Sequence, residues 1–222
     1  MNLLIAPARR RLLTLALAAL VGTSLAPAAS AADGVRNLVY RVTHATFGDI
    51  GTYTNLIDVA NGITTVKTTA HLVVKMVGVV VHREEAQRVE RWQGNRLISF
   101  HGVTVTDGEP YEVKGQAQGN AFVITTPKGT VTAPATVHPS NPLSPVTLQT
   151  SEMMRVENGK VEPVQISGGG ETMVKIGETA IPAREYKIGG SVEYRVWFDR
   201  HDVPVKFVVY DPSGEVEFSL QR

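Results

Sequence analysis

The stretch ITTVKTTAHLVVKMVGVVVHREEAQRVERW, residues 63–92, decides the fold of this chain. Its even-numbered positions from Val66 to Met76 are mostly apolar, whereas the apolar positions beyond Gly78, from Val79 to Val81, include the odd-numbered ones. Alternation with a period of two is typical of a β-strand with one buried face. The change of phase predicts a bulge or a sharp bend at Gly78, between two long strands. Long, bent antiparallel strands favour a strongly curved sheet or half-barrel over a flat sandwich.

The same alternation recurs along the rest of the chain, for instance in residues 191–198 and 215–220. Between such runs lie pairs of residues that tolerate positive φ and favour tight turns, among them Asn61-Gly62, Asp107-Gly108 and Asn158-Gly159. The spacing of these turns predicts an all-β chain, an antiparallel meander of nine to eleven strands. No linker-like composition divides residues 32–222, so we expect a single β-rich domain there.

The first 31 residues have the order of a secretory signal peptide. Arg9-Arg10-Arg11 precede an apolar run from Leu12 to Val21, and Ala29-Ser30-Ala31 supplies small residues for cleavage after Ala31. The paired arginines ahead of Leu12-Leu13 fit either the twin-arginine or the Sec export route. A retained N-terminal membrane anchor is the alternative, but the apolar run is short for a bilayer about 30 Å thick. We therefore expect a signal-peptide helix and a periplasmic or secreted mature protein.

Charge and composition narrow the possible partners. Three of the 22 basic residues belong to the expected leader, which leaves 19 basic and 21 acidic residues in the mature chain. This near-neutral balance argues against nucleic-acid binding, which needs a concentrated basic face. No basic cluster outside the leader indicates a polybasic membrane patch, and we expect no integral membrane span after cleavage. The chain has no cysteine, which excludes disulfides and thiol chemistry.

One segment, residues 133–146, departs from the strand pattern because it contains four prolines, which a central strand does not accommodate. We expect a long surface crossing there, followed by a short helix within residues 146–156. Long irregular segments in compact domains often serve as lids or binding loops. A plain connection between two halves of the sheet and a lid are both consistent with this composition.

The polar residues contain no recognisable catalytic or metal-binding motif. The six histidines lack the short spacings of local metal sites, although His71 and His82 are candidates to face each other across a hairpin. The densest polar cluster, Asp199-Arg200-His201-Asp202, falls where a turn is expected, and the turn propensity of aspartate explains it. We assign no metal, no cofactor and no catalytic residue from these patterns.

Several local patterns in this order resemble an exported bacterial family, domain of unknown function 6134. They are Gly48-Asp49-Ile50-Gly51, Val74-Lys75-Met76-Val77-Gly78, Glu90-Arg91-Trp92-Gln93-Gly94-Asn95-Arg96-Leu97, Ile181-Pro182-Ala183-Arg184-Glu185-Tyr186 and Val196-Trp197-Phe198-Asp199. The resemblance covers about residues 35–222, and the layout is also similar to domain of unknown function 3108. Both resemblances imply a curved antiparallel sheet like that of lipoprotein-carrier and sensor domains. Neither implies an activity, a cofactor or a catalytic residue.

The expected fold leads to three hypotheses of function. A curved sheet that does not close leaves a concave apolar face, which suits a small hydrophobic or lipid-like ligand. Candidate lining residues are Met76, Trp92, Phe100 and Phe198, and the alternative is that these side chains fill the core. The second hypothesis is a protein-interaction or assembly module of the cell envelope. The third is an enzyme whose polar groups come together from separate strands.

Overall fold

The computed structural model of the chain describes residues 34–191, 193–211 and 213–221. The expected signal peptide at residues 1–31, its helix and its cleavage after Ala31 lie outside the described residues. Within the described residues, no helix has the length and hydropathy that crossing a bilayer requires.

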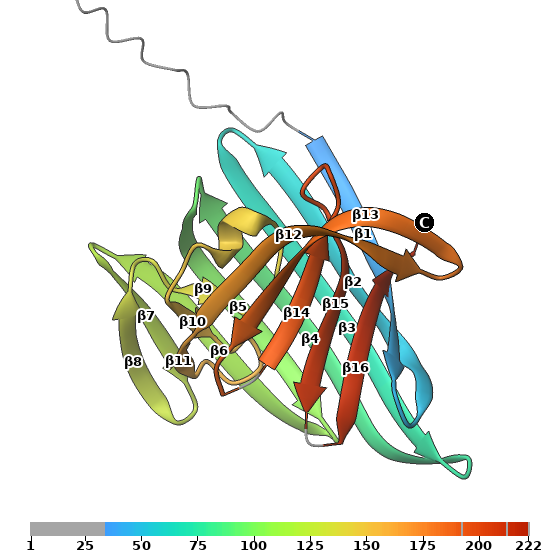
Figure 1. The fold of residues 1–222 in the computed structure, drawn as a ribbon. Coiled ribbons are helices and arrows are strands. Elements are labelled where there is room, and N and C mark those ends of the chain that lie inside the picture. The colour runs from blue at the N-terminus through green and yellow to red at the C-terminus, as the bar shows by residue number, and fades with distance from the viewer. Residues whose placement is uncertain (1–33, 192, 212, 222) are drawn as a thin grey trace, which may run out of the picture. The chain divides into compact units, whose positions relative to one another are not determined.

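Nearly all regular structure in the described residues is β-strand (Figure 1). The first eight strands are β1 (Gly34–His44), β2 (Gly48–Ala60), β3 (Ile63–Met76), β4 (Val79–Gln93), β5 (Arg96–Thr106), β6 (Glu109–Gln118), β7 (Ala121–Thr126) and β8 (Gly129–Pro134). The next three are the short strands β9 (His138–Pro139), β10 (Glu152–Met154) and β11 (Val161–Pro163). The last five are β12 (Gln165–Ile176), β13 (Thr179–Gly189), β14 (Glu193–Phe198), β15 (Pro204–Asp211) and β16 (Gly214–Leu220).

Thirteen of these strands form one antiparallel sheet in the order β12-β13-β14-β15-β16-β1-β2-β3-β4-β5-β6-β7-β8. The last strand, β16, pairs with the first, β1, so that Phe218 lies opposite Val42. The outer strands β8 and β12 do not pair with each other in the described part, and the sheet is not closed into a barrel. The prediction of a strongly curved antiparallel sheet is confirmed.

The number of strands is larger than the nine to eleven predicted. The hairpins around β6, β7 and β8 turn at Gly119-Asn120 and near Gly129, and β12 and β13 turn at Gly177. Gly119 and Gly177 have φ of 54° and 57°, in the left-handed region that glycine adopts without steric cost. These residues are not counted among the turn signals of the sequence. The predicted number of strands is therefore smaller than the number in the structure.

The turn between the two longest strands, β3 and β4, consists of Val77 and Gly78. Both residues have positive φ, 50° and 80°, as a two-residue type I′ hairpin turn requires. The change of phase predicted at Gly78 is therefore a sharp turn. The bulge of this hairpin lies inside the ladder, where the register shifts between Val74 and Lys75.

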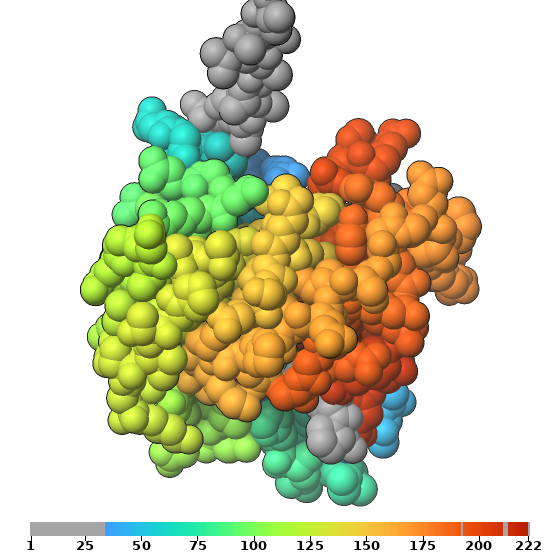
Figure 2. Space-filling model, turned by 60° about the vertical axis from the view of Figure 1, so that its left-hand side comes forward, coloured from blue at the N-terminus to red at the C-terminus, as the bar shows by residue number. Residues whose placement is uncertain are grey.

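The proline-rich segment is not a surface crossing, which corrects the expectation from sequence. Residues 135–164, here called the plug segment, contain the three-stranded sheet β11-β10-β9 and lie across the concave side of the large sheet (Figure 2). Val137, Asn141 and Met154 are each at least 97% buried. Apolar residues spaced between the prolines make this segment part of the hydrophobic core, because the open side of a curved sheet has to be covered.

The short helix expected within residues 146–156 is also corrected. In this stretch the structure has the 3₁₀ turn η1 (Pro145–Leu148), and Met153 and Met154 lie in strand β10. Prolines at positions 142 and 145 limit helix formation before Val146, and the two methionines instead join β10 to its neighbours. Both methionine side chains are buried in the main core.

The Val77 position yields a test of the turn geometry. A β-branched residue in the left-handed region is strained, whereas asparagine adopts it readily. We expect Val77→Asn to raise the free energy of unfolding by about 1 kcal/mol, measured by urea denaturation. Val79→Asn, at an exposed strand position of the same hairpin, is the control and brings no gain. A Val77→Asn variant no more stable than the natural chain would contradict this account of the turn.

Candidate functional site

A cavity of about 660 Å³ lies between the plug segment and the sheet. Its walls come from the strands β1 to β4 and β14 to β16 and from the plug segment. The apolar lining consists chiefly of Phe47, Ile50, Tyr53, Ala70, Leu72, Val74, Val81, Pro142, Met153, Val156, Val164, Tyr194, Phe207, Val209, Val216 and Phe218. The polar lining consists of His44, His82, Glu84, Arg88, Ser140, Arg155, Glu157, Glu162 and Ser213. This volume and this mostly apolar lining are typical of sites for small organic ligands.

An aromatic cluster forms the wall of the cavity on the side of β2, β15 and β16. Phe207 and Phe218 stack with their ring centroids 4.2 Å apart. Tyr53 meets both rings edge-on, at 5.7 Å from Phe207 and 5.4 Å from Phe218. Edge-on and stacked ring pairs add to the stability that burial alone gives. The cluster therefore provides a rigid wall.

The pairing of β3 with β4 gives the cavity two distinct ends. The inward-facing residues pair as Thr68 with Arg88, Ala70 with Ala86, Leu72 with Glu84 and Val74 with His82. The inner end, at Ala70 and Arg88, adjoins a buried polar network. The outer end, at Val74 and Val81, points toward the β3–β4 turn. Apolar side chains of β3 thus connect a charged inner end to the outer end.

The buried polar network at the inner end joins the plug segment to the sheet. The side-chain amide of Asn141 donates to Oε1 of Glu90 at 3.0 Å, and its Oδ1 accepts from the Tyr53 hydroxyl at 3.1 Å. The other carboxylate oxygen of Glu90 accepts from Nε1 of Trp92 at 3.0 Å. Asn55 and Thr68 complete the network through Asn141. Buried polar groups need such partners, so the network fixes where Asn141 sits.

Burial has the largest effect on the acid-base behaviour of this network. It raises the pKa of Glu90 to about 7, although the hydrogen bonds from Asn141 and Trp92 and the charge of Arg88 act in the opposite direction. Burial likewise raises the pKa of Tyr53 to about 12, while the charge of Arg88 lowers it. At neutral pH, Glu90 is therefore close to its midpoint, and the Tyr53 hydroxyl is neutral.

Arg88 is the cation on the sheet side of the cavity, and its side chain is 5% exposed. Its Nη2 donates to Oγ1 of Thr104 at 3.1 Å and lies 3.8 Å from Oε1 of Glu84. Its Nε is buried and has no hydrogen-bond partner among the described residues. Gly102, on β5, leaves room for this side chain, because a Cβ there would lie 3.1 Å from Cγ of Arg88.

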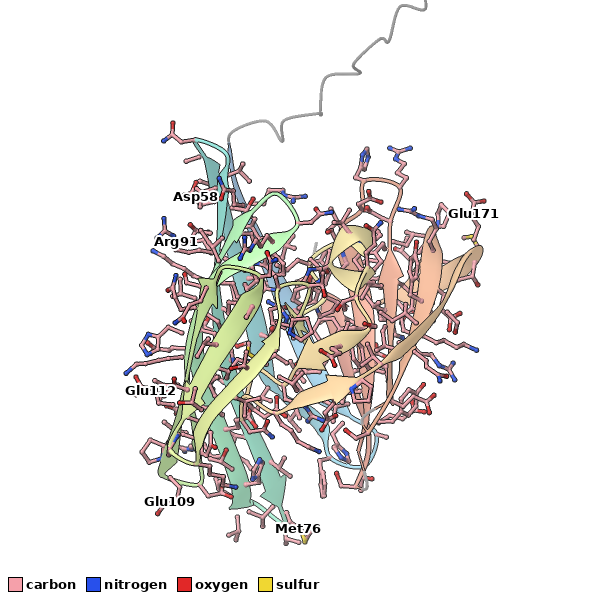
Figure 3. All side chains as sticks on the ribbon, turned by 90° about the vertical axis from the view of Figure 1, so that its left-hand side faces the viewer. Asp58, Met76, Arg91, Glu109, Glu112 and Glu171 are labelled. Carbon is pink, nitrogen blue, oxygen red and sulfur yellow. The ribbon has the colours of Figure 1, made fainter. Side chains whose placement is uncertain are left out.

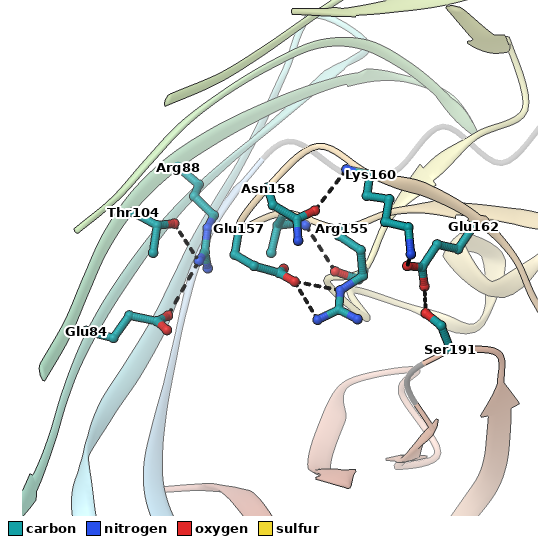
Figure 4. Close-up of polar contacts among 11 residues, drawn as sticks. Glu84, Arg88, Thr104, Arg155, Glu157, Asn158, Lys160, Glu162 and Ser191 are labelled. Atoms are coloured by element: carbon teal, nitrogen blue, oxygen red, sulfur yellow. Dashed lines mark hydrogen bonds and ion pairs between the residues drawn. The ribbon is translucent and has the colours of Figure 1, made fainter. Parts of the chain in front are cut away.

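The plug segment contributes charged residues that are already paired (Figure 4). Arg155 holds Glu157 at 2.5 Å, and Lys160 holds Glu162 at 2.6 Å. Glu162 also accepts a hydrogen bond from Ser191. Arg155, Glu157 and Glu162 line the cavity opposite the polar side chains of β4, whereas Lys160 is 65% exposed and lies outside the lining.

One pair in the cavity wall has the residue types of a nucleophile and its base, but its hydrogen bonding does not fit that role. Nε2 of His44 lies 3.0 Å from Oγ of Ser213. Nδ1 of His44 accepts from the backbone N–H of Thr46 at 3.0 Å, so the neutral imidazole carries its proton on Nε2. Such an imidazole donates to the serine and does not withdraw its proton. The pair therefore gives no support to a hydrolytic site.

The structure places none of the four predicted ligand-lining residues in the cavity wall. Trp92, Phe100 and Phe198 are at most 3% exposed and belong to the main hydrophobic core. The Trp92 ring packs edge-on against His138 of the plug segment, which covers that part of the concave face. Met76 lies at the far end of the β3–β4 hairpin and is 52% exposed (Figure 3).

The structure also shows the positions of the two polar groups considered in the sequence, the pair His71 and His82 and the cluster from Asp199 to Asp202. His71 and His82 do not face each other, because His71 pairs with Glu85 and His82 contacts Asp107 at 3.0 Å. The cluster from Asp199 to Asp202 forms the turn between β14 and β15, as predicted. There Oδ1 of Asp199 accepts from the backbone N–H groups of His201 and Val203.

Sequence reasoning missed Arg88 and Glu84 as site residues. The signal that marks them is their even number, which they share with the buried Ala86 and Trp92 on the same strand. Both faces of residues 82–91 carry charges, so hydropathy alone does not show which charges point inward. The cavity residues of the plug segment carry no comparable signal, because that segment has no regular period.

The fold and the cavity together define a class of protein: an antiparallel half-barrel whose concave side is partly filled by its own plug segment. Residues 40–221 match the domain of unknown function DUF6134, and the chain belongs to this family. Among solved structures, the chain is similar to a β-barrel-like protein of the domain of unknown function DUF1849 from Brucella abortus. That likeness has 11% sequence identity and a TM-score of 0.64, and it covers 85% of this chain and 96% of the other. At this identity it concerns the fold alone. No curated protein matches the chain.

The raised pKa of Glu90 predicts a pH dependence of stability. Between the ordinary value of 4.5 and about 7, the unfolded chain releases this proton while the folded chain retains it. The free energy of unfolding should therefore fall as the pH rises through this window, by an amount on the order of 3 kcal/mol, and then level off. The Glu90→Gln variant stays neutral and should lack this part of the fall. Urea denaturation at a series of pH values tests it, and parallel curves for the two proteins would contradict the assignment.

Proposed function

We propose that this protein is an exported, non-enzymatic binding protein that holds a small hydrophobic or lipid-like ligand in the cell envelope. The observation that carries the proposal is the apolar cavity of about 660 Å³ between the plug segment and the sheet. Well-packed protein interiors contain few voids larger than a water molecule. A cavity of this size beside a close-packed core is therefore consistent with a site that a ligand fills. Export follows from the expected signal peptide and is part of the proposal.

The position of the cavity supports exchange of the ligand with a lipid environment. The outer end lies toward the β3–β4 turn, where the residues from Met76 to Val81 other than Gly78 are between 44% and 99% exposed and apolar. Val74 and Val81 belong both to this hairpin and to the cavity wall. An apolar ligand leaving the outer end therefore meets an apolar surface before it reaches water.

The same hairpin favours a second candidate function, that of an envelope interaction module. Val77, which is 99% exposed, lies at the tip of an apolar surface that extends into solvent. Contiguous exposed apolar residues often mark contacts with proteins or membranes. In this alternative the partner binds the hairpin tip, and the cavity stays without a ligand.

Ligand binding can be tested with a substitution that fills the cavity. Leu72 lines the cavity, whereas Val73, its neighbour on the same strand, is not part of the lining. We expect the delipidated natural protein, exposed to an envelope lipid extract, to retain a lipid that mass spectrometry detects. Leu72→Trp should reduce the amount retained by about tenfold or more, because the larger ring occupies the cavity. Val73→Trp is the matched control and should retain as much as the natural protein.

The two candidate functions give different results in this experiment. Failure of the natural protein to retain any lipid, together with crosslinking of a protein partner through the β3–β4 turn in cells, would favour the interaction module. Equal retention by the Leu72→Trp and Val73→Trp variants would place the bound lipid outside the cavity and overturn the proposed site.

A further inference from the structure

We propose that the ligand of the cavity carries an acidic head group, a carboxylate as in a fatty acid, and that Arg88 binds this group at the inner end while the apolar tail extends to the outer end. This inference rests on the proposed function and specifies the class of ligand. Four features of the site support it: the unpaired Nε of Arg88, the distances within the ion pairs, the neighbouring Glu90 and the arrangement of apolar residues along the cavity.

The first feature is the hydrogen bonding of Arg88. A guanidinium has five N–H donors and is always charged at physiological pH. One donor reaches Thr104, and Nε is buried without a partner among the described residues. An unsatisfied donor on a buried charge is costly. A carboxylate accepts two parallel hydrogen bonds from a guanidinium, and a head group held against Arg88 in the cavity wall would give this cation a charged acceptor.

The second feature is the difference between Arg88 and two cations of the plug segment, of which Arg155 lines the cavity and Lys160 does not. Arg155 and Lys160 hold carboxylates at 2.5 and 2.6 Å, distances at which the charges are closely paired. Arg88 lies 3.8 Å from Glu84, beyond hydrogen-bond distance. The Arg88 side chain is also more buried than that of Arg155, 5% against 26% exposed. Its charge is therefore the least compensated and the least screened of the three.

The third feature is the state of the neighbouring carboxyl group. Glu90 is fully buried on the same face of β4 as Arg88, and burial raises its pKa to about 7. Glu90 is therefore close to its midpoint near neutral pH, and its protonated fraction does not offset the charge of Arg88. An anionic head group is consequently favoured over a neutral or cationic one at this end of the cavity.

The fourth feature is the direction of the cavity. Starting from Arg88, the wall on β3 continues through Ala70, Leu72 and Val74 toward the outer end. The stacked rings of Phe207 and Phe218 face the same space. An alkyl tail that begins at Arg88 would thus contact apolar groups of β3 and the aromatic cluster, while Glu84 and His82 on β4 also line this part of the cavity. The opposite orientation would put the apolar tail against the polar network and the head group among the valines of the hairpin.

The experiment compares an acid with its uncharged analogue. Dodecanoate and methyl dodecanoate have the same tail, and their binding to the full mature chain is measured by displacement of a fluorescent apolar probe. We expect the natural protein to bind dodecanoate more tightly, and Arg88→Met to weaken dodecanoate by about 10- to 100-fold. Binding of the methyl ester to Arg88→Met should change by less than about threefold, since the ester makes no charged contact. Arg155→Met is the matched control, because Arg155 also lines the cavity but already has a carboxylate partner.

The outcomes separate this inference from the proposed function. Binding of neither compound to the natural protein would overturn both. Equal binding of acid and ester, with no effect of Arg88→Met, would overturn the acidic head group and leave a hydrophobic ligand in place. A loss with Arg155→Met as large as that with Arg88→Met would also overturn the assignment to Arg88. If Arg88→Met does not fold, Arg88→Lys serves instead. It keeps the charge but loses the planar pair of donors, and an acid affinity equal to that of the natural protein would contradict the paired contact.

Discussion

The hydrogen bonds of Asn141 are the interaction on which the rest of the structure depends. They join the plug segment to three neighbouring strands of the sheet, through Tyr53 and Asn55 on β2, Thr68 on β3 and Glu90 on β4. A half-barrel has an open concave face, and an apolar face of that size is not stable in water. The plug segment covers this concave face. The hydrogen-bond network determines the position of the plug segment along the strands. Breaking this network would leave several buried polar groups without partners at once.

This placement divides the concave side into a filled part and a hollow part. Toward Trp92 the plug segment packs tightly, with the His138 ring against the indole and its two nitrogens next to the carbonyl oxygens of Asn95 and Thr147. On the other side of the network the plug segment contributes both apolar side chains and paired charges to the wall and leaves the cavity open. The same residues, Glu90 and Asn141, thus form the boundary between core and cavity.

The chemistry of the cavity agrees with a binding site more than with a catalytic one. Its walls are rigid and apolar, and its polar side chains are mostly engaged in ion pairs or, as with His44, hydrogen-bonded in a form that does not serve a nucleophile. The distinctive group is Arg88, a buried cation whose hydrogen-bonding capacity is only partly used. The apolar β3–β4 hairpin at the outer end gives the cavity a direction, with charge inside and apolar surface outside.

The sequence by itself determined the class of fold. The period of two in residues 63–92, the Gly and Asn turn signals and the phase change at Gly78 together indicate long, curved antiparallel strands, because side chains of a strand alternate between two faces whatever lies far away in the chain. They also indicated the turn at Asp199–Asp202, where the turn chemistry is local. Hairpins such as β6–β7 were not predicted from the sequence, because their turn residues lie between strands with weak alternation of apolar and polar residues.

Only the tertiary structure decided which residues form the site. Trp92, Phe100 and Phe198 have the hydrophobicity of ligand-lining residues, but whether such residues face a ligand or the core depends on where the plug segment lies. That position follows from long-range hydrogen bonds of Asn141, which no local pattern encodes. Arg88 is likewise one of several charges on a strand that is polar on both faces, and it became distinct only when the curvature of the sheet turned its even-numbered residues inward. Local periodicity determines which residues form strands. The packing of segments that are distant in the sequence determines whether a given face of a strand contacts the core or the cavity.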